Sequence, residues 1–248
     1  MSFICCLCIT ACSKDGINDT SINLSTEVII AIPSQKINYL PYYVAMKNGY
    51  FEEEGITVKE KIVKDSSKVY EEVSGNKADI GCGTIDSLLY NSREYANDSQ
   101  LVFAQVEKCI EKDFNKTPSY VNDYTDSSIY VGMYANKSFI NHSPGTIQKI
   151  SNAICMGEVF ISNSKSTDIA SLISDIFPEV DKDKLVDQIE FMKNKNFFPQ
   201  NPITLRDDYE SALSYLKSKE DSKISETDLF NKLIDNTYAY KSVNDLDS

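Results

Sequence analysis

The sequence contains no tryptophan and a single histidine, His142. This composition limits which residues could act in catalysis or stack against a ligand. His142 stands between Asn141 and Ser143 at the start of an expected helix, where a solvated or capping role fits it better than that of a general base. The motifs GxSxG, HExxH, GxGxxG and the phosphate-binding P-loop are all missing from the chain. We therefore expect no catalytic residue, no metal and no cofactor. Because tryptophan is absent, any aromatic side chain that stacks against a ligand would be a Tyr or a Phe.

Basic residues are also scarce, because 25 Lys and Arg stand against 37 Asp and Glu, a net charge of −12. The acidic residues are spread along the chain, and the clustered Lys and Arg that nucleic acid requires are lacking. The same charge disfavours docking on an anionic membrane surface. It does not exclude a small anionic ligand, because a binding site is local. With 42% hydrophobic residues in 248, the chain can build a substantial core.

Four of the seven cysteines crowd the first twelve residues: Cys5, Cys6, Cys8 and Cys12. A zinc site there would lack histidine and a second pair of ligands, so we do not expect one. Residues 3–9 form an apolar run too short to span a bilayer, and Ile-Thr-Ala-Cys12 follows before a polar stretch. This resembles a bacterial lipobox, although no Lys or Arg precedes the run. It implies a signal peptide at 1–11, lipidation of Cys12 and a tether at 12–25.

The most informative stretch, residues 39–58, reads YLPYYVAMKNGYFEEEGITV. An uninterrupted apolar run at 28–32 precedes it, which is typical of a strand buried on both faces. Pro41 suits the first turn of a helix, and Gly49 suits a left-handed residue that ends it. Residues 57–63 are rich in Val and Ile and favour another strand. Strand, helix and strand in this order predict a parallel pair with a right-handed crossover.

Further strands and helices follow. A helix is predicted over 66–75, capped by one of its first two serines. A third strand precedes the glycine-rich loop at 81–83, and residues 100–106 favour a fourth strand. A return strand begins at Ser128, and from Ser143 onward apolar residues recur at helical spacing. This order predicts an α/β fold with a mostly parallel sheet, flanking helices and a helical C-terminal part.

The stretch 39–58 also resembles the first helix and turn of solute-binding proteins of ABC importers, which have the periplasmic-binding-protein-like type II fold. The similarity is to the group for nitrate, sulfonates and the pyrimidine precursor of thiamine. The resemblance implies two lobes that close over a solute. A lobe takes on the order of 100 residues, and the chain leaves no room for the second one. We expect a first lobe core at 26–107, a shortened connection at 108–128, and a return strand with C-terminal helices at 129–248.

Polar and aromatic residues follow the ends of three expected strands. In a parallel sheet these ends share one edge, where open α/β sheets bind ligands. Each residue taken singly is more simply a loop side chain or part of a tight turn, and only their convergence favours a site. Free N–H groups at the helix start after Thr84 would suit a carboxylate, a sulfonate or a ring carbonyl. The expected ligand-binding residues are Gln35, Asn38, Tyr39, Tyr42, Gly83, Thr84, Asp86, Gln105 and Glu107.

Taken with the resemblance, these features predict an extracytoplasmic, lipid-anchored solute-binding component of an ABC transporter. It would be a monomer that contacts the membrane through its lipid anchor alone and delivers a small molecule to permease subunits. The missing lobe leaves open a degenerate or repurposed lipoprotein of the same fold, which binds a protein partner or nothing. An enzyme on this fold is a weaker third hypothesis, because the histidine-rich motif of enzymes that make the thiamine pyrimidine is absent.

Overall fold

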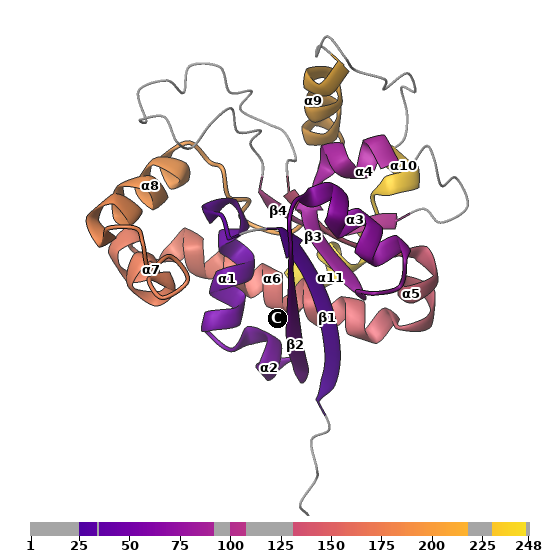
Figure 1. The fold of residues 1–248 in the computed structure, drawn as a ribbon, viewed down its shortest axis with the longest axis horizontal. Coiled ribbons are helices and arrows are strands. Elements are labelled where there is room, and N and C mark those ends of the chain that lie inside the picture. Colours follow the sequence, from indigo (N-terminus) through magenta and orange to yellow (C-terminus); the bar gives the residue numbers. More distant parts are fainter. Residues whose placement is uncertain (1–24, 34, 92–99, 108–130, 218–229, 247–248) are drawn as a thin grey trace, which may run out of the picture.

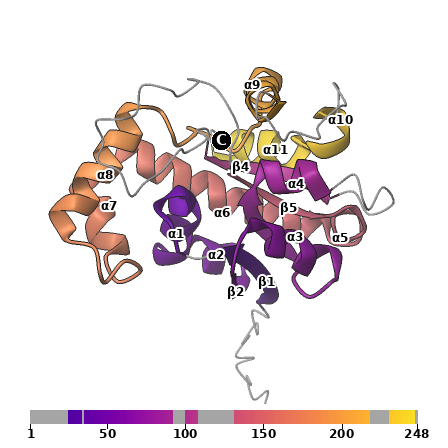
Figure 2. The ribbon, with the colours of Figure 1, turned by 45° about the horizontal axis from the view of Figure 1, so that its top comes forward.

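The computed structural model describes residues 25–33, 35–91, 100–107, 131–217 and 230–246. At its centre is a five-stranded sheet in the order β2-β1-β3-β5-β4, with helices on both faces (Figures 1 and 2). The strands are β1 (Thr26–Pro33), β2 (Ile56–Val63), β3 (Ile80–Thr84), β4 (Gln100–Glu107) and β5 (Val131–Asn136).

The helical elements connect these strands and then form the C-terminal part. They are η1 (Ile37–Tyr39), α1 (Leu40–Lys47), α2 (Tyr50–Glu53), α3 (Ser66–Ser74), α4 (Ile85–Asn91), α5 (Lys137–His142), α6 (Pro144–Asn163), α7 (Ser166–Ile173), α8 (Lys182–Asn194), α9 (Arg206–Lys217), α10 (Phe230–Leu233) and α11 (Thr237–Leu246). Within the described ranges, no helix has both the length and the hydrophobicity needed to span a bilayer.

The predicted strand–helix–strand unit is confirmed. β1 and β2 pair in parallel along their whole length, from Thr26 opposite Ile56 to Pro33 opposite Val63. Proline stands in the first turn of α1, as expected for a residue that has no N–H to leave unpaired. Gly49 lies between α1 and α2 with a φ of 77°, the left-handed conformation that ends a helix at little cost for glycine.

The sheet is mixed, and of its five described strands only β5 runs against the others. β3 pairs in parallel with β1, whereas β5 is antiparallel to both β3 and β4. The carboxyl ends of β1, β2, β3 and β4 therefore share one edge of the sheet. Thr84 at the end of β3 and Glu107 at the end of β4 both pair with Val131, the first residue of β5. The prediction of a mostly parallel sheet flanked by helices is confirmed.

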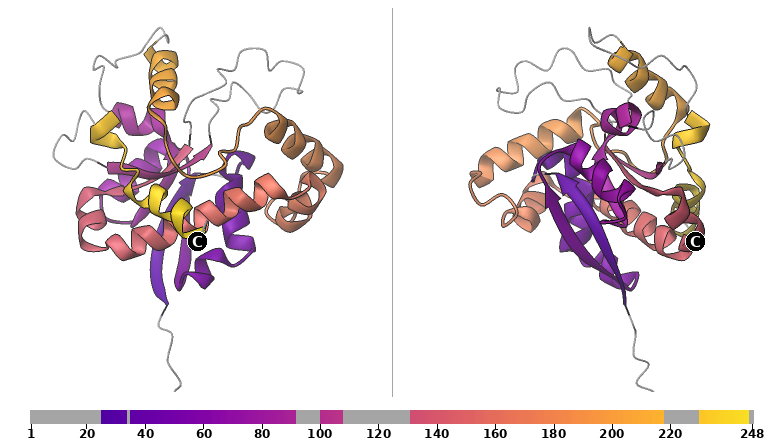
Figure 3. Two further views of the ribbon diagram at one scale, coloured as in Figure 1. Left: turned by 180° about the vertical axis from the view of Figure 1, so that it is seen from behind. Right: turned by 45° about the vertical axis from the view of Figure 1, so that its right-hand side comes forward.

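Two apolar layers cover the two faces of the sheet. The larger lies between the sheet and helices α1, α6, α7 and α8, and the smaller between the opposite face and α3, α4 and α9. Seen from behind, the long helix α6 crosses the molecule with α11 beside it (Figure 3). In the smaller layer the ring of Tyr134 lies directly over Gly81, where a Cβ atom would come within 2.5 Å of that ring.

The start of α3 differs from the prediction. Its N-cap is Asp65, whose carboxylate accepts a hydrogen bond of 3.0 Å from the backbone N–H of Lys68, rather than one of the first two serines of the helix. Asp65 has the extended backbone that an N-cap needs, while both serines already lie inside the helix.

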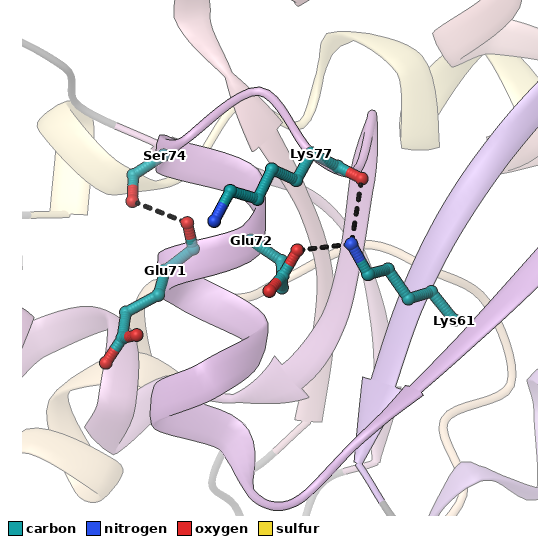
Figure 4. A network of polar contacts seen from close by, with 5 residues as sticks. All are labelled: Lys61, Glu71, Glu72, Ser74 and Lys77. Carbon is teal, nitrogen blue, oxygen red and sulfur yellow. Dashed lines mark hydrogen bonds and ion pairs between the residues drawn. The ribbon is translucent and has the colours of Figure 1, made fainter.

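A cluster of charged residues ties the edge strand β2 to α3 and to the turn after it (Figure 4). The ammonium group of Lys61 pairs with Glu72 on α3 and also donates a 3.3 Å hydrogen bond to the carbonyl of Lys77. Charged side chains on an edge strand discourage pairing with another chain. This edge of the sheet is therefore protected by its own side chains.

Candidate functional site

The first set of predicted site residues follows β1. Gln35 is exposed, whereas Asn38 and Tyr39 on η1 are buried, with 2% and 3% of their surfaces accessible. Helix α1 begins immediately after them. The chain thus turns inward after β1 and places an amide and a phenol inside the protein, close to the carboxyl edge of the sheet.

Tyr42, on the first turns of α1, is fully buried. Its hydroxyl donates a hydrogen bond of 3.1 Å to Oε1 of Glu60 on β2, and its ring lies 5.5 Å from that of Tyr43 and 5.9 Å from that of Phe51. Burial raises the pKa of Tyr42 well above its ordinary value, and the neighbouring carboxyl of Glu60 raises it further. Tyr42 therefore stands in the larger apolar layer as a neutral, hydrogen-bonded phenol.

The second set follows β3. The backbone N–H of Thr84 donates to Oγ of Ser66 at 3.4 Å, and its hydroxyl lies 3.2 Å from that of Ser87. Gly83 lies under the hydroxyl of Tyr134, since a Cβ on this glycine would come within 3.0 Å of it. The side chain of Asp86 is outside the described residues. The backbone N–H of Thr84, the last residue of β3, is thus already bonded within the protein.

The third set ends β4, and Gln105 is its most unusual member. The residue is fully buried, and its backbone N–H donates to the carbonyl of Pro202 at 2.8 Å. Neither the nitrogen nor the oxygen of its side-chain amide has a hydrogen-bond partner within the described part of the chain. Leaving a buried polar group unpaired costs about 1–3 kcal/mol. The side chain of Glu107 is outside the described residues, although its backbone pairs with β5.

Gln105 belongs to a row of three residues across the sheet. It pairs with Gly132 on β5, which in turn pairs with Gly83 on β3. Residues that pair directly present their side chains on the same face, and Tyr134 over Gly83 shows that this is the face of the smaller layer. The three predicted sets thus meet at one edge, but Gln105 and Tyr42 belong to opposite layers.

Several buried polar residues were not predicted, and Glu158 is one of them. Glu158 is fully buried on α6, where it continues the apolar stripe that contains Ile154 and Ile161. The adjacent Gly157 lies so close to α1 that a Cβ would be 2.5 Å from the carbonyl oxygen of Pro41. The only signal in the sequence was a glutamate at a position where the helical spacing places a core residue.

The described residues contain no candidate metal site. No group of three or more His, Cys, Asp or Glu there could hold a metal ion. His142 ends α5 at the surface, with Nδ1 2.7 Å from the carbonyl oxygen of Ser138. Cys82 and Cys155 are buried, and neither forms a disulfide within the described residues. Cys12, Cys109, the signal peptide and most of the tether lie outside the described ranges.

Two hollows border Lys193 on α8, and none of the residues that line them belongs to the predicted site. One of about 130 Å³ is lined by residues that include Phe198 and Gln200, and an open one of about 380 Å³ lies against Thr167 and Glu190. The ammonium group of Lys193 donates to the carbonyl of Ser164, and partial burial lowers its pKa. These hollows lack the convergent strand ends that mark a ligand site in an open α/β sheet.

Comparison with known proteins agrees with this geometry. A family model described as NMT1/THI5 like matches residues 36–108, a range that contains most of the predicted site. A protein from Bordetella bronchiseptica RB50 superposes with a TM-score of 0.73 at 16% identity, over 90% of this chain and 99% of that one. No curated protein matches the sequence.

Two further similar structures are of periplasmic proteins named for the solutes that they bind. The periplasmic nitrate-binding protein NrtA from Synechocystis PCC 6803 gives a TM-score of 0.60 at 8% identity, over 90% of this chain and 89% of that one. The periplasmic aliphatic sulphonate binding protein SsuA from Escherichia coli gives 0.55 at 7% identity, over 84% and 97%. The chain has the periplasmic-binding-protein fold, and the predicted resemblance to the nitrate and sulfonate group is confirmed. Solute-binding proteins of this fold are in general not enzymes.

Proposed function

We propose that the protein is the extracytoplasmic solute-binding component of an ABC importer. It captures a small molecule at the carboxyl ends of β1, β3 and β4 and delivers it to the permease subunits. The fold, the match to the NMT1/THI5-like model and the periplasmic binding proteins among its structural neighbours support this proposal. Lipidation of Cys12, with a tether over 12–25, would hold a monomer at the outer face of the membrane.

The observation that carries the proposal is the unpaired amide of Gln105. A protein tolerates such a group when a ligand or water satisfies it, because its burial otherwise opposes folding. The amide offers an acceptor oxygen and two donor hydrogens, so it can form hydrogen bonds with a planar solute or donate them to an anion. Gly132 and Gly83, which lie beside it in the row, carry no side chains, and Val102 and Tyr134 pack closely over them.

The proposed protein would hold its solute with one complete lobe and lack most of a second lobe. Residues 26–107 would form the core of one lobe, with 108–128 in place of most of a second lobe and 129–248 completing the structure. Ordinary members of the group close two lobes around the solute. Here one lobe would supply most of the contacts, so we expect weaker binding than in a protein with two complete lobes.

A thermal-shift screen against nitrate, alkanesulfonates and pyrimidines tests the proposal. A solute at 100 times its dissociation constant stabilises by about 2.7 kcal/mol, which is about 5–10 °C in a domain of this size. Gln105→Leu should raise the melting temperature of the solute-free protein, because it removes an unpaired buried amide, and should abolish the shift caused by the solute.

Thr204→Val is the matched control. Thr204 is also buried, and its hydroxyl has no hydrogen-bond partner in the described residues, but it does not belong to the row at the strand ends. The variant should raise the melting temperature and leave the solute-dependent shift unchanged. A screen in which no solute shifts the wild type would favour the alternative, a lipoprotein of this fold that binds a protein partner.

A further inference from the structure

Lys193 is a half-buried cation with which no carboxylate of the described residues forms an ion pair. It lies in the last turn of α8, and its ammonium group donates a hydrogen bond to the carbonyl of Ser164, the residue that follows α6. Partial burial lowers the pKa of Lys193. Taking an ammonium group out of water without pairing it with an anion opposes folding. The position of this lysine therefore favours a nearby anion.

The hydrogen bond to Ser164 accounts for only part of what the ammonium group offers. A cation near the carboxyl end of a helix is favourable, because the last carbonyl groups have no partner within the helix. An ammonium group has three N–H donors and no acceptor. One of the three is directed to the carbonyl of Ser164. Two are left for an acceptor in a hollow that Lys193 lines.

The hollow of about 130 Å³ beside Lys193 combines polar groups with an apolar wall. Just after α8, Asn196 has a left-handed backbone with a φ of 54°, and the chain that it turns back lines the same hollow. Ile161 and Phe198 supply apolar surface, while Asn196 and Gln200 carry amide groups that can donate hydrogen bonds. Among the described residues that line this hollow, none is acidic. Its lining therefore suits a ligand with a negative head and an apolar tail.

We propose that this hollow is a second binding site, and that it takes a small carboxylate with a short apolar tail. The carboxylate accepts hydrogen bonds from Lys193 and from the amides, and the tail packs against Ile161 and Phe198. A volume of about 130 Å³ is that of about four water molecules, and a cavity of similar size holds a ring of about six carbon atoms. Butyrate, with about as many heavy atoms, fits these limits. The proposal is independent of the solute site, because none of the residues that line the hollow belongs to the strand ends.

The test measures binding of sodium butyrate to the full chain by calorimetric titration and by saturation-transfer NMR. The wild type should bind butyrate with a dissociation constant on the order of 1 mM. Formate lacks the tail and 1-butanol lacks the charge, so each should bind at least about tenfold more weakly. Equal binding of either probe would overturn the proposal, and so would a wild type that does not bind butyrate. This comparison needs no variant.

Three variants then locate the bound butyrate. Lys193→Met keeps the length of the side chain and removes its charge, and it should weaken binding at least about tenfold. Lys195→Met removes an equal charge from an exposed position two residues away and should leave the affinity unchanged. Gln105→Leu should bind butyrate as the wild type does. Unchanged affinity of Lys193→Met would overturn the proposal, as would loss of binding in Gln105→Leu, which would assign butyrate to the strand ends instead.

Discussion

The hydroxyl of Tyr42 on α1 donates a hydrogen bond of 3.1 Å to Oε1 of Glu60 on β2, and so joins a buried helix to the edge strand. Burial raises the pKa values of both groups, although the hydrogen bond from Tyr42 lowers that of Glu60 in part. Tyr43, the next residue, also has a raised pKa because it is buried. The folded protein therefore needs both phenols in their protonated form.

Alkaline pH should destabilise the protein through these two tyrosines. In the unfolded chain a tyrosine loses its proton near pH 10, before it can do so in the folded state. The stability they contribute is complete below that pH and is lost above it, at up to about 1.4 kcal/mol per pH unit for each residue. Urea unfolding of the wild type between pH 8 and 11 should show this decline.

The variant Tyr42→Phe should lose stability less steeply above pH 10, by about 1.4 kcal/mol per pH unit. Tyr240→Phe is the control, because Tyr240 is 55% exposed on α11. It should leave the slope unchanged. Equal slopes for the wild type and Tyr42→Phe would show that Tyr42 ionises as readily in the folded protein as in the unfolded chain.

Two glycines of α6 should respond oppositely to alanine. A Cβ at Gly157 would meet the backbone of Pro41 at 2.5 Å, whereas a Cβ at Gly145 has nothing within 4 Å. Gly157→Ala should force α1 and α6 apart and cost about 1–3 kcal/mol or more. Gly145→Ala should gain up to about 1 kcal/mol from helix propensity. Denaturant unfolding measures both, and a neutral Gly157→Ala would show that the helices separate easily.

Removing the N-cap of α3 should have a smaller effect on the stability of the protein. Asp65→Ala should cost about 1 kcal/mol in the free energy of unfolding, because the N–H of Lys68 loses its acceptor. Ser67 is exposed inside the same helix, and Ser67→Ala should change stability by less than about 0.5 kcal/mol. If the serine variant were the more damaging one, the cap would lie within the helix after all.

Local signals were enough to predict the first half of the fold. The apolar run of β1, the proline of α1 and the left-handed Gly49 each act through their own backbone preferences, and the structure confirms them. The reversed direction of β5 has no local signal. It is decided by pairing with both β3 and β4, which brings Thr84 and Glu107 opposite the same residue, Val131.

The placement of the predicted site was only partly accessible from the sequence. The rule for parallel strands brought the three residue sets to one edge, but it does not say which side chains turn inward. The burial of Tyr42 depends on how α1 is rotated against the sheet, and the unpaired amide of Gln105 depends on its register with Gly132. The burial of Glu158 was not predicted, because its spacing indicates a core position whereas its charge favours an exposed one.

The pairing of Glu107 and Val131 with each other has an evolutionary consequence. The chain leaves the sheet at Glu107 and re-enters it at Val131, which is the residue paired with Glu107. The number of residues between these two points therefore does not change the register of any strand. A whole module could be gained or trimmed at this junction while the remainder keeps its shape. Grafting the corresponding segment of a longer relative between these two residues should therefore yield a foldable chimera.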